Sequence, residues 1–170
     1  EYLAMLDWSI GYKEHPVAIR VPVGPTVPAT RPVPSDYSEL NKYEVVNRGK
    51  DVALLALGNF FALGESVCRL LEAQGIHATL VNPRFISGVD TALLDSLQAD
   101  HSVVVTLEDG ALEGGFGEKI ARHYGPSAMR TLCYGAKKEF ADRYDAQEFL
   151  AANRLVDTLI AEDVATLLHA

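Results

Sequence analysis

The sequence predicts an α/β fold, a three-layer domain in which a mostly parallel sheet carries helices on both faces. A helix and strand from the tail of another domain are expected to precede it. Two observations predict the main domain. Apolar runs of strand length alternate with segments of helical periodicity from residue 51 onward. The run DVALLALG at 51–58 is also apolar on both alternating faces, as expected for a central strand that is buried on both sides.

The composition limits the class of protein. The 170 residues carry a net charge of −8 without a compensating basic stripe, which argues against nucleic-acid and anionic-membrane partners. Only two cysteines occur, Cys68 and Cys133, and each lies in an apolar periodic segment, which predicts buried thiols rather than a disulfide. This usage fits a reducing cytoplasm. We therefore expect a cytoplasmic protein with no nucleic-acid and no membrane partner.

The first 42 residues differ from the rest. Residues 2–12 have helical spacing, and HPVAIRVPV at 15–23 is a short β-rich run. Five of the eight prolines fall between Pro22 and Pro34, which predicts an extended linker because proline fixes φ and removes a backbone donor. We expect 1–24 to be the tail of a preceding domain, 25–42 the proline-rich linker and 43–170 the main domain. The chain opens without a methionine, so we also expect it to be a piece of a longer chain.

The elements of the main domain follow in order. Residues 43–58 offer two β runs around Asn47–Lys50, which predicts a hairpin. Asn59 and Gly75 are suited to start and end the first helix, and Asp90 is the expected N-cap of the second. Strands are predicted at 51–58, 77–84, 101–108 and 129–135, and helices at 59–75, 90–98, 117–125, 148–155 and 158–169.

The glycine-rich stretch between the third strand and its helix is the first candidate for chemistry. A dinucleotide fingerprint fails because Ile120 stands where the third glycine is needed, and a P-loop fails because Glu118 follows Gly117. Carboxylates flank the turn and would repel a phosphate. We therefore favour a structural loop, while binding of a small anion by the helix amides stays the alternative. The residues of this structural loop are Glu108, Gly114, Gly115 and Gly117.

The other candidate residues do not form an active site. The five histidines are scattered, which argues against a metal site, and Ser66 lies in an incomplete nucleophile-elbow pattern. Arg84 follows a strand, where ligands bind in open α/β sheets, although a salt bridge is the favoured role. Arg20 is the better candidate for contacting an anion. We predict no catalytic residue and no metal ligand in this chain.

Four segments carry a resemblance to a known family. They are MLDWSIGYKEHPVAIRVPVG, KDVALLALG, VNPRFISGVD and TLEDGALEGGFG, and their order resembles that in the C-terminal part of the 1-deoxy-D-xylulose-5-phosphate synthase family. These are transketolase-like enzymes that depend on thiamine diphosphate and Mg²⁺. The resemblance implies that 1–24 end the pyrimidine-binding domain and that 43–170 form a transketolase-like C-terminal domain. It implies that the cofactor binds outside this chain. This chain would support the preceding domains of the same protein and contribute to a homodimer.

The family reaction would make the full-length protein a transferase. It joins pyruvate and glyceraldehyde 3-phosphate, releases CO₂ and yields 1-deoxyxylulose 5-phosphate, a precursor of isoprenoids and thiamine. The resemblance implies an arginine at residue 23 for the acceptor's phosphate, but the sequence has Val23 and retains only Arg20 of the pair. Either Arg20 or Arg31 takes over the contact, or the acceptor differs, as in a divergent transketolase or 2-oxoacid dehydrogenase β subunit. A non-catalytic dimerisation module is the remaining alternative, and we expect the chain alone to be inactive.

Overall fold

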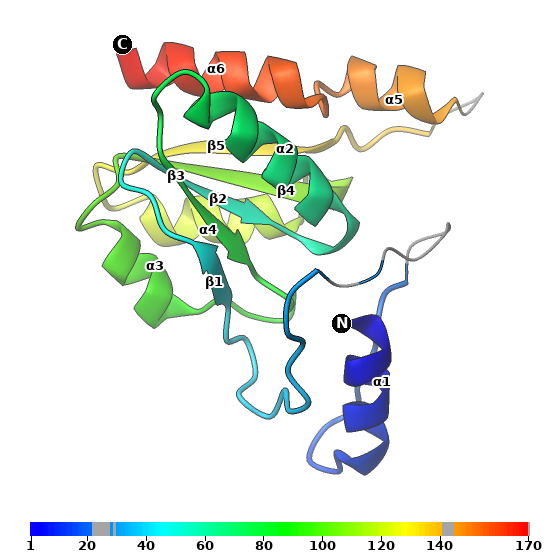
Figure 1. Ribbon diagram of the computed structural model, residues 1–170. Coiled ribbons are helices and arrows are strands. Elements are labelled where there is room, and N and C mark those ends of the chain that lie inside the picture. Colours follow the sequence, from blue (N-terminus) through cyan, green and yellow to red (C-terminus); the bar gives the residue numbers. More distant parts are fainter. Residues whose placement is uncertain (22–27, 29, 141–144, 170) are drawn as a thin grey trace. The chain divides into compact units, whose positions relative to one another are not determined.

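A computed structural model describes residues 1–21, 28, 30–140 and 145–169. These residues fall into two compact units, Glu1–Leu40 and Asn41–Ala170. The larger unit contains a five-stranded sheet in the order β1-β3-β2-β4-β5 (Figure 1). The strands are β1 (Glu44–Asn47), β2 (Val52–Ala56), β3 (Ala78–Asn82), β4 (Val103–Ala111) and β5 (Arg130–Ala136). Strands β2 to β5 run parallel to one another, whereas β1 is antiparallel to its neighbour β3.

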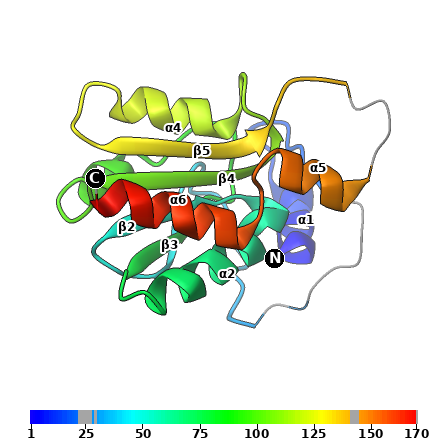
Figure 2. The same ribbon diagram turned by 90° about the horizontal axis from the view of Figure 1, so that it is seen from above.

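Helices cover both faces of this sheet, so the predicted three-layer α/β fold is confirmed (Figures 1 and 2). The helices of one face are α2 (Phe61–Glu72) and α6 (Asp157–His169), and those of the other are α3 (Thr91–Leu97) and α4 (Phe116–Tyr124). A shorter helix, α5 (Ala146–Ala152), precedes α6. All five residues of β2 are fully buried because alternate side chains pack into separate cores. Leu54 packs with α2 and α6, whereas Leu55 packs with α3 and α4.

The predicted hairpin between the first two strands is wrong. Strand β1 pairs with β3, with Glu44 opposite Asn82, and the connection then crosses the amino end of β3 to reach β2. Backbone hydrogen bonds stabilise this crossing, since the amides of Lys50 and Asp51 donate to the His77 carbonyl at 3.0 and 3.1 Å. Gly49 is required there because a Cβ atom would lie 2.2 Å from the His77 oxygen. The hairpin pattern cannot reveal this long-range crossing.

The smaller unit contains the predicted N-terminal helix, α1 (Tyr2–Gly11), whose Leu3 and Ile10 are 73% and 77% exposed. The β-rich run after it forms no strand over its described residues, 15–21. The reason is that a strand needs a neighbour for its backbone groups, and the described part of this unit contains no other strand. Val23 and most of the first proline-rich residues lie outside the described part of the chain.

Of two predicted helix N-caps, the structure confirms one, Asp90, and contradicts the other, Asn59. Asp90 caps α3 as predicted, since its Oδ1 atom accepts a bond of 3.1 Å from the Leu93 amide. Its other oxygen, Oδ2, accepts from the Tyr43 amide at 3.1 Å. Asn59 does not cap α2, because a 3₁₀ turn at Gly58–Phe60 precedes the helix and Phe60 takes the N-cap position.

Replacing Asp90 by alanine should destabilise the chain by about 2 kcal/mol, because it removes a helix cap and leaves the buried Tyr43 amide without its acceptor. Urea unfolding followed by circular dichroism measures this. Asp145→Ala is the matched control: it removes an exposed cap that accepts from two amides of α5, and it should cost about 1 kcal/mol. Equal losses in the two variants would contradict the role of the second Asp90 bond.

Candidate functional site

The carboxyl ends of the parallel strands meet at one edge of the sheet (Figure 1). Ligands of open α/β sheets bind at this edge. The loop after β3 carries Arg84, and the glycine-rich stretch follows Glu108 of β4. Strand β4 does not end at Glu108 but continues to Ala111 through an irregularity in its pairing with β5. This edge is therefore the candidate functional site of the larger unit.

Glu108 occupies the amino terminus of α4. Its side chain is buried, and its Oε2 and Oε1 atoms accept bonds of 2.7 and 2.8 Å from the amides of Phe116 and Gly117. The first amides of a helix have no partner within the helix and carry the positive end of its dipole. A bound anion would use these same donors. The chain's own carboxylate thus fills the place where a phosphate would lie.

The glycines around this contact provide space for the carboxylate. A Cβ atom on Gly115 would lie 2.5 Å from Glu108 Oε2, and one on Gly117 would lie 2.7 Å from Thr106 Oγ1. Gly114 has a φ of +75°, in the left-handed region that favours glycine. Its amide donates to Glu118 Oε2 at 2.9 Å, so a second carboxylate braces the turn. The arrangement is that of a closed structural turn, and it offers no open phosphate cradle.

Arg84 is held by an ion pair, the role that the sequence favoured for it. Its Nη2 atom lies 2.7 Å from Glu44 Oε2, and the two side chains are 11% and 24% exposed. The Nδ2 atom of Asn82 donates to the same oxygen at 3.4 Å. From the opposite side, Lys119 of α4 donates through Nζ to the carbonyl oxygen of Ile86. The loop that carries Arg84 is therefore fixed between β1 and α4.

Two sequence candidates remain, Arg20 and Ser66. Arg20 is exposed and lies in the smaller unit. Ser66 donates to Asp157 Oδ2 at 2.5 Å and so connects α2 to α6, a structural role. Among the described residues, no three His, Cys, Asp or Glu side chains are placed to hold a metal ion.

Both cysteines are free thiols in the described structure. Burial is the main cause that raises the pKa of Cys68, to about 11, and the neighbouring Glu65 raises it further. Burial likewise raises the pKa of Cys133. Thiols with raised pKa values are poor nucleophiles near neutral pH, because the thiolate is the reactive form. In the same described residues, no helix is both long and apolar enough to cross a bilayer.

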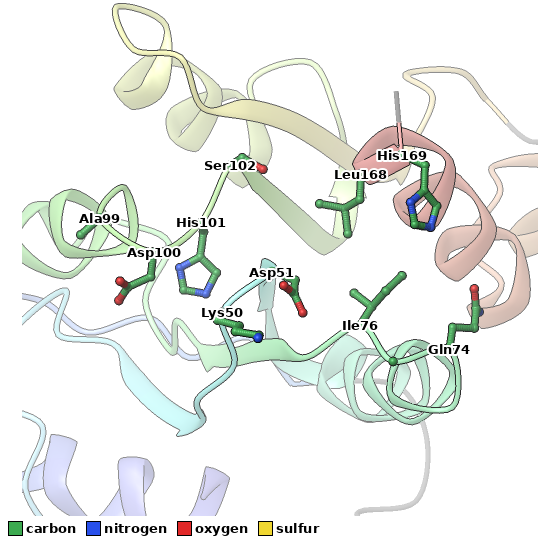
Figure 3. A pocket seen from close by; sticks show the side chains of 11 residues that line it. Lys50, Asp51, Gln74, Ile76, Ala99, Asp100, His101, Ser102, Leu168 and His169 are labelled. Carbon is green, nitrogen blue, oxygen red and sulfur yellow. The ribbon is translucent and has the colours of Figure 1, made fainter.

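A cavity of about 520 Å³ lies at the opposite edge, where the parallel strands begin, and no sequence pattern predicted it. Figure 3 shows His101 on one side of this cavity and Leu168 and His169 on the other. His101 is buried, with Nδ1 3.0 Å from the Leu97 carbonyl and Nε2 2.8 Å from the Thr79 hydroxyl. Both ring nitrogens of His101 contact protein oxygens, so this histidine supports the wall of the cavity. The lining residues are Lys50, Asp51, Gln74, Gly75, Ile76, Ala99, Asp100, His101, Ser102, Leu168 and His169.

Comparisons with known proteins identify relatives of this arrangement. Residues 41–137 match the family described as transketolase, C-terminal domain. The 1-deoxy-D-xylulose-5-phosphate synthase 2 of Jannaschia sp. (strain CCS1) is 31% identical over 172 residues, covering 97% of this chain and 26% of that protein. The corresponding synthase of Pseudoalteromonas translucida is 41% identical over 111 residues, covering 65% of this chain and 17% of that protein. The chain thus spans about a quarter or less of these relatives.

Solved structures agree on the fold. A structure described as a split gene transketolase, inactive beta4 tetramer, aligns with a TM-score of 0.69 and 26% identity, covering 76% of this chain and 43% of that chain. A transketolase R525L mutant from Pichia stipitis aligns with a TM-score of 0.54 and 16% identity, covering 76% of this chain and 18% of that chain. The second similarity concerns the fold alone.

Replacing Glu108 by alanine should destabilise the chain by about 3 kcal/mol, because the buried amides of Phe116 and Gly117 lose a charged acceptor. The vacated space should then take formate or acetate, which would restore part of the lost stability. Urea unfolding measures both effects, with and without each anion at 100-fold molar excess over the protein. Glu113→Ala, on the exposed part of the same turn, should leave stability and anion response unchanged. A Glu108→Ala variant as stable as the unsubstituted chain would contradict the account.

Proposed function

We infer the function from one premise: the chain belongs to the transketolase C-terminal domain family. Its relatives include synthases and transketolases, which are transferases. We propose that it is the C-terminal part of a 1-deoxy-D-xylulose-5-phosphate synthase. The full-length protein would join pyruvate to glyceraldehyde 3-phosphate, release CO₂ and so supply a precursor of isoprenoids and thiamine.

One observation carries this proposal. The similarity to a synthase extends over 97% of the chain, at 31% identity, and therefore includes the Glu1–Leu40 unit as well as the sheet. A match confined to the sheet would support only the widespread C-terminal domain. The proposed organisation keeps residues 1–24 as the end of the pyrimidine-binding domain, 25–42 as the linker and 43–170 as the C-terminal domain.

The family's thiamine diphosphate and Mg²⁺ do not fit the residues that the structure describes. The amides of α4 that could receive a diphosphate already bond the Glu108 carboxylate. The described residues also offer no group of side chains for a metal ion. We therefore propose that the preceding domains bind the cofactor and that this chain supports them and contributes to a homodimer in the cytoplasm. No step of the reaction is assigned to a side chain here.

The acceptor's phosphate requires a positive contact, and two arginines can provide it. The family resemblance implies an arginine at position 23, and Val23 cannot form a guanidinium–phosphate pair, so Arg20 and Arg31 are the candidates for this contact. Separate replacements of Arg20 and Arg31 decide between them.

A second function shares the cofactor but not the acceptor. The valine at position 23 and the TM-score of 0.69 to a split-gene transketolase favour a transketolase-like enzyme as the runner-up. Such an enzyme would transfer a two-carbon unit between sugar phosphates and would not need pyruvate. The two candidates therefore differ in their donor substrate.

The full-length protein, supplied with Mg²⁺ and thiamine diphosphate, should release CO₂ from pyruvate at a rate that rises when glyceraldehyde 3-phosphate is added. Release of ¹⁴CO₂ from [1-¹⁴C]pyruvate measures this directly, and omission of the aldehyde is the control. Transfer from xylulose 5-phosphate without CO₂ release would favour the transketolase-like reaction. Absence of both reactions would contradict the proposal that the protein is a transferase of this family.

The 170-residue chain alone should neither bind thiamine diphosphate nor release CO₂, because the proposal assigns the cofactor contacts to preceding domains of the full-length protein. Isothermal titration with thiamine diphosphate and Mg²⁺ measures the binding, with the full-length protein as positive control. A dissociation constant below about 100 μM for the chain alone, corresponding to roughly 5 kcal/mol or more, would overturn this expectation.

A further inference from the structure

We propose that the segment Asp36–Ser38 is a latch, which fastens the end of the proline-rich linker to α1 and confines the freedom between the two compact units to Glu39 and Leu40. The linker predicted over 25–42 would by itself let the units move apart along its whole length. The contacts of Asp36–Ser38 tie it down before it ends. Such a joint does not depend on which reaction the full-length protein performs.

A short chain of hydrogen bonds joins the latch to α1. The indole Nε1 atom of Trp8 donates to Ser38 Oγ at 3.3 Å, and the same hydroxyl donates to Asp36 Oδ1 at 2.6 Å. The Ser38 amide also donates to this carboxylate oxygen, at 3.0 Å. The two bonds from Ser38 lower the pKa of Asp36, so its carboxylate is ionised near neutral pH. Ser38 therefore connects the helix to a charged acceptor through one hydroxyl.

Aromatic rings add to this contact. The rings of Trp8 and Tyr37 meet edge to face, with centroids 5.8 Å apart and planes at 67°, and the Trp8 and Tyr12 centroids are 4.7 Å apart. Such pairs stabilise beyond the surface that they bury. Helix α1 has ten residues and none of them is buried. A helix of this length is marginal in water without tertiary contacts, and the latch supplies them.

The first residues of the larger unit are fastened separately. The Ser87 hydroxyl donates to Asn41 Oδ1 at 2.9 Å. The Tyr43 amide donates to Asp90 Oδ2 at 3.1 Å, and Lys42 Nζ lies 3.7 Å from the same oxygen. Each residue from 41 to 43 thus contacts a distant part of its own unit.

Glu39 and Leu40, the pivot, lie between these two sets of contacts. Both side chains are exposed, and a backbone bond of 2.9 Å joins the Leu40 amide to the Ser38 carbonyl. The three Cα–Cα steps from Ser38 to Asn41 span at most about 11 Å, whereas the stretch 25–42 could extend to roughly 60 Å. A few backbone torsions are enough to let rigid parts turn. With the latch closed, the two units therefore turn about one short joint.

Limited proteolysis of the full-length protein with a glutamate-specific protease tests the latch. Cleavage after Glu39 gives a fragment that begins at Leu40, which mass spectrometry identifies. Ser38→Ala removes the bridging hydroxyl and should raise the initial cleavage rate at this bond about 5-fold, because cleavage follows the population of the opened segment. Trp8→Phe keeps an aromatic ring but removes the N–H donor, and it should also raise the rate. The double variant should be no faster than Ser38→Ala, since the two side chains share one bond.

Three controls separate the latch from general loosening. Ser38→Thr keeps the hydroxyl and should be cleaved at the rate of the unsubstituted protein. Ser9→Ala removes another hydroxyl of α1, which bonds the Leu6 carbonyl at 2.7 Å, and it should not change the rate. Cleavage after Glu65, within α2, reports unfolding of the larger unit and should stay constant. Equal rates for Ser38→Ala and Ser9→Ala, or an equal rise after Glu65, would overturn the latch.

Insertions test the pivot. Gly-Ser-Gly-Ser inserted after Leu40 lengthens the free joint, whereas the same insertion between Arg31 and Pro32 lies inside the segment that the latch closes. Small-angle X-ray scattering of the full-length protein should show a maximum dimension larger by about 10 Å for the first insertion and unchanged for the second. In the Ser38→Ala background the second insertion should also increase this dimension.

Two scattering results would overturn the pivot. One is an equal increase for both insertions in the unsubstituted background, because the linker would then extend along its whole length. The other is no change for the insertion after Leu40. Neither proteolysis nor scattering requires turnover, so failure of CO₂ release would contradict the proposed function and leave the latch standing.

Discussion

The contact between the Glu108 carboxylate and the first amides of α4 is the interaction on which the carboxyl edge depends. It joins the last part of β4 to the start of the next helix through two short bonds to backbone donors. Because these amides would otherwise be buried without partners, the carboxylate satisfies the helix terminus and fixes its direction. The same helix then reaches across to the loop of Arg84 through Lys119. A glycine-rich turn that resembles a phosphate site is thus closed by the protein itself.

The two edges of the sheet therefore differ in kind. At the amino edge a cavity of about 520 Å³ is bounded by loops and by the end of α6, and both ring nitrogens of its buried His101 contact protein oxygens. At the carboxyl edge the chain presents an arginine in a restrained conformation beside a carboxylate. This asymmetry agrees with the general position of ligands in open parallel sheets.

The sequence predicted most of the fold and less of the site, for physical reasons. A buried parallel strand such as Val52–Ala56 was predictable because its residues are continuously apolar. The helix cap by Asp90 was predictable because its acceptor contact lies only three residues along the chain. The partner of β1 was not, because the backbone crossing at Gly49 depends on the distant His77 carbonyl. The glycines predicted a tight turn. They did not predict that β4 continues past Glu108 or that the Glu108 carboxylate accepts hydrogen bonds from the first amides of α4. The Glu44–Arg84 pair joins residues 40 positions apart, which no local pattern reveals.

The Glu108 carboxylate closes the glycine-rich turn of this domain, and we propose that the preceding domains bind the cofactor. A crystal structure of the full-length protein with thiamine diphosphate and Mg²⁺ tests it most directly. The account predicts that the diphosphate lies away from α4 and that Glu108 still accepts from the amides of Phe116 and Gly117. A diphosphate bound at those amides, with Glu108 displaced, would contradict it.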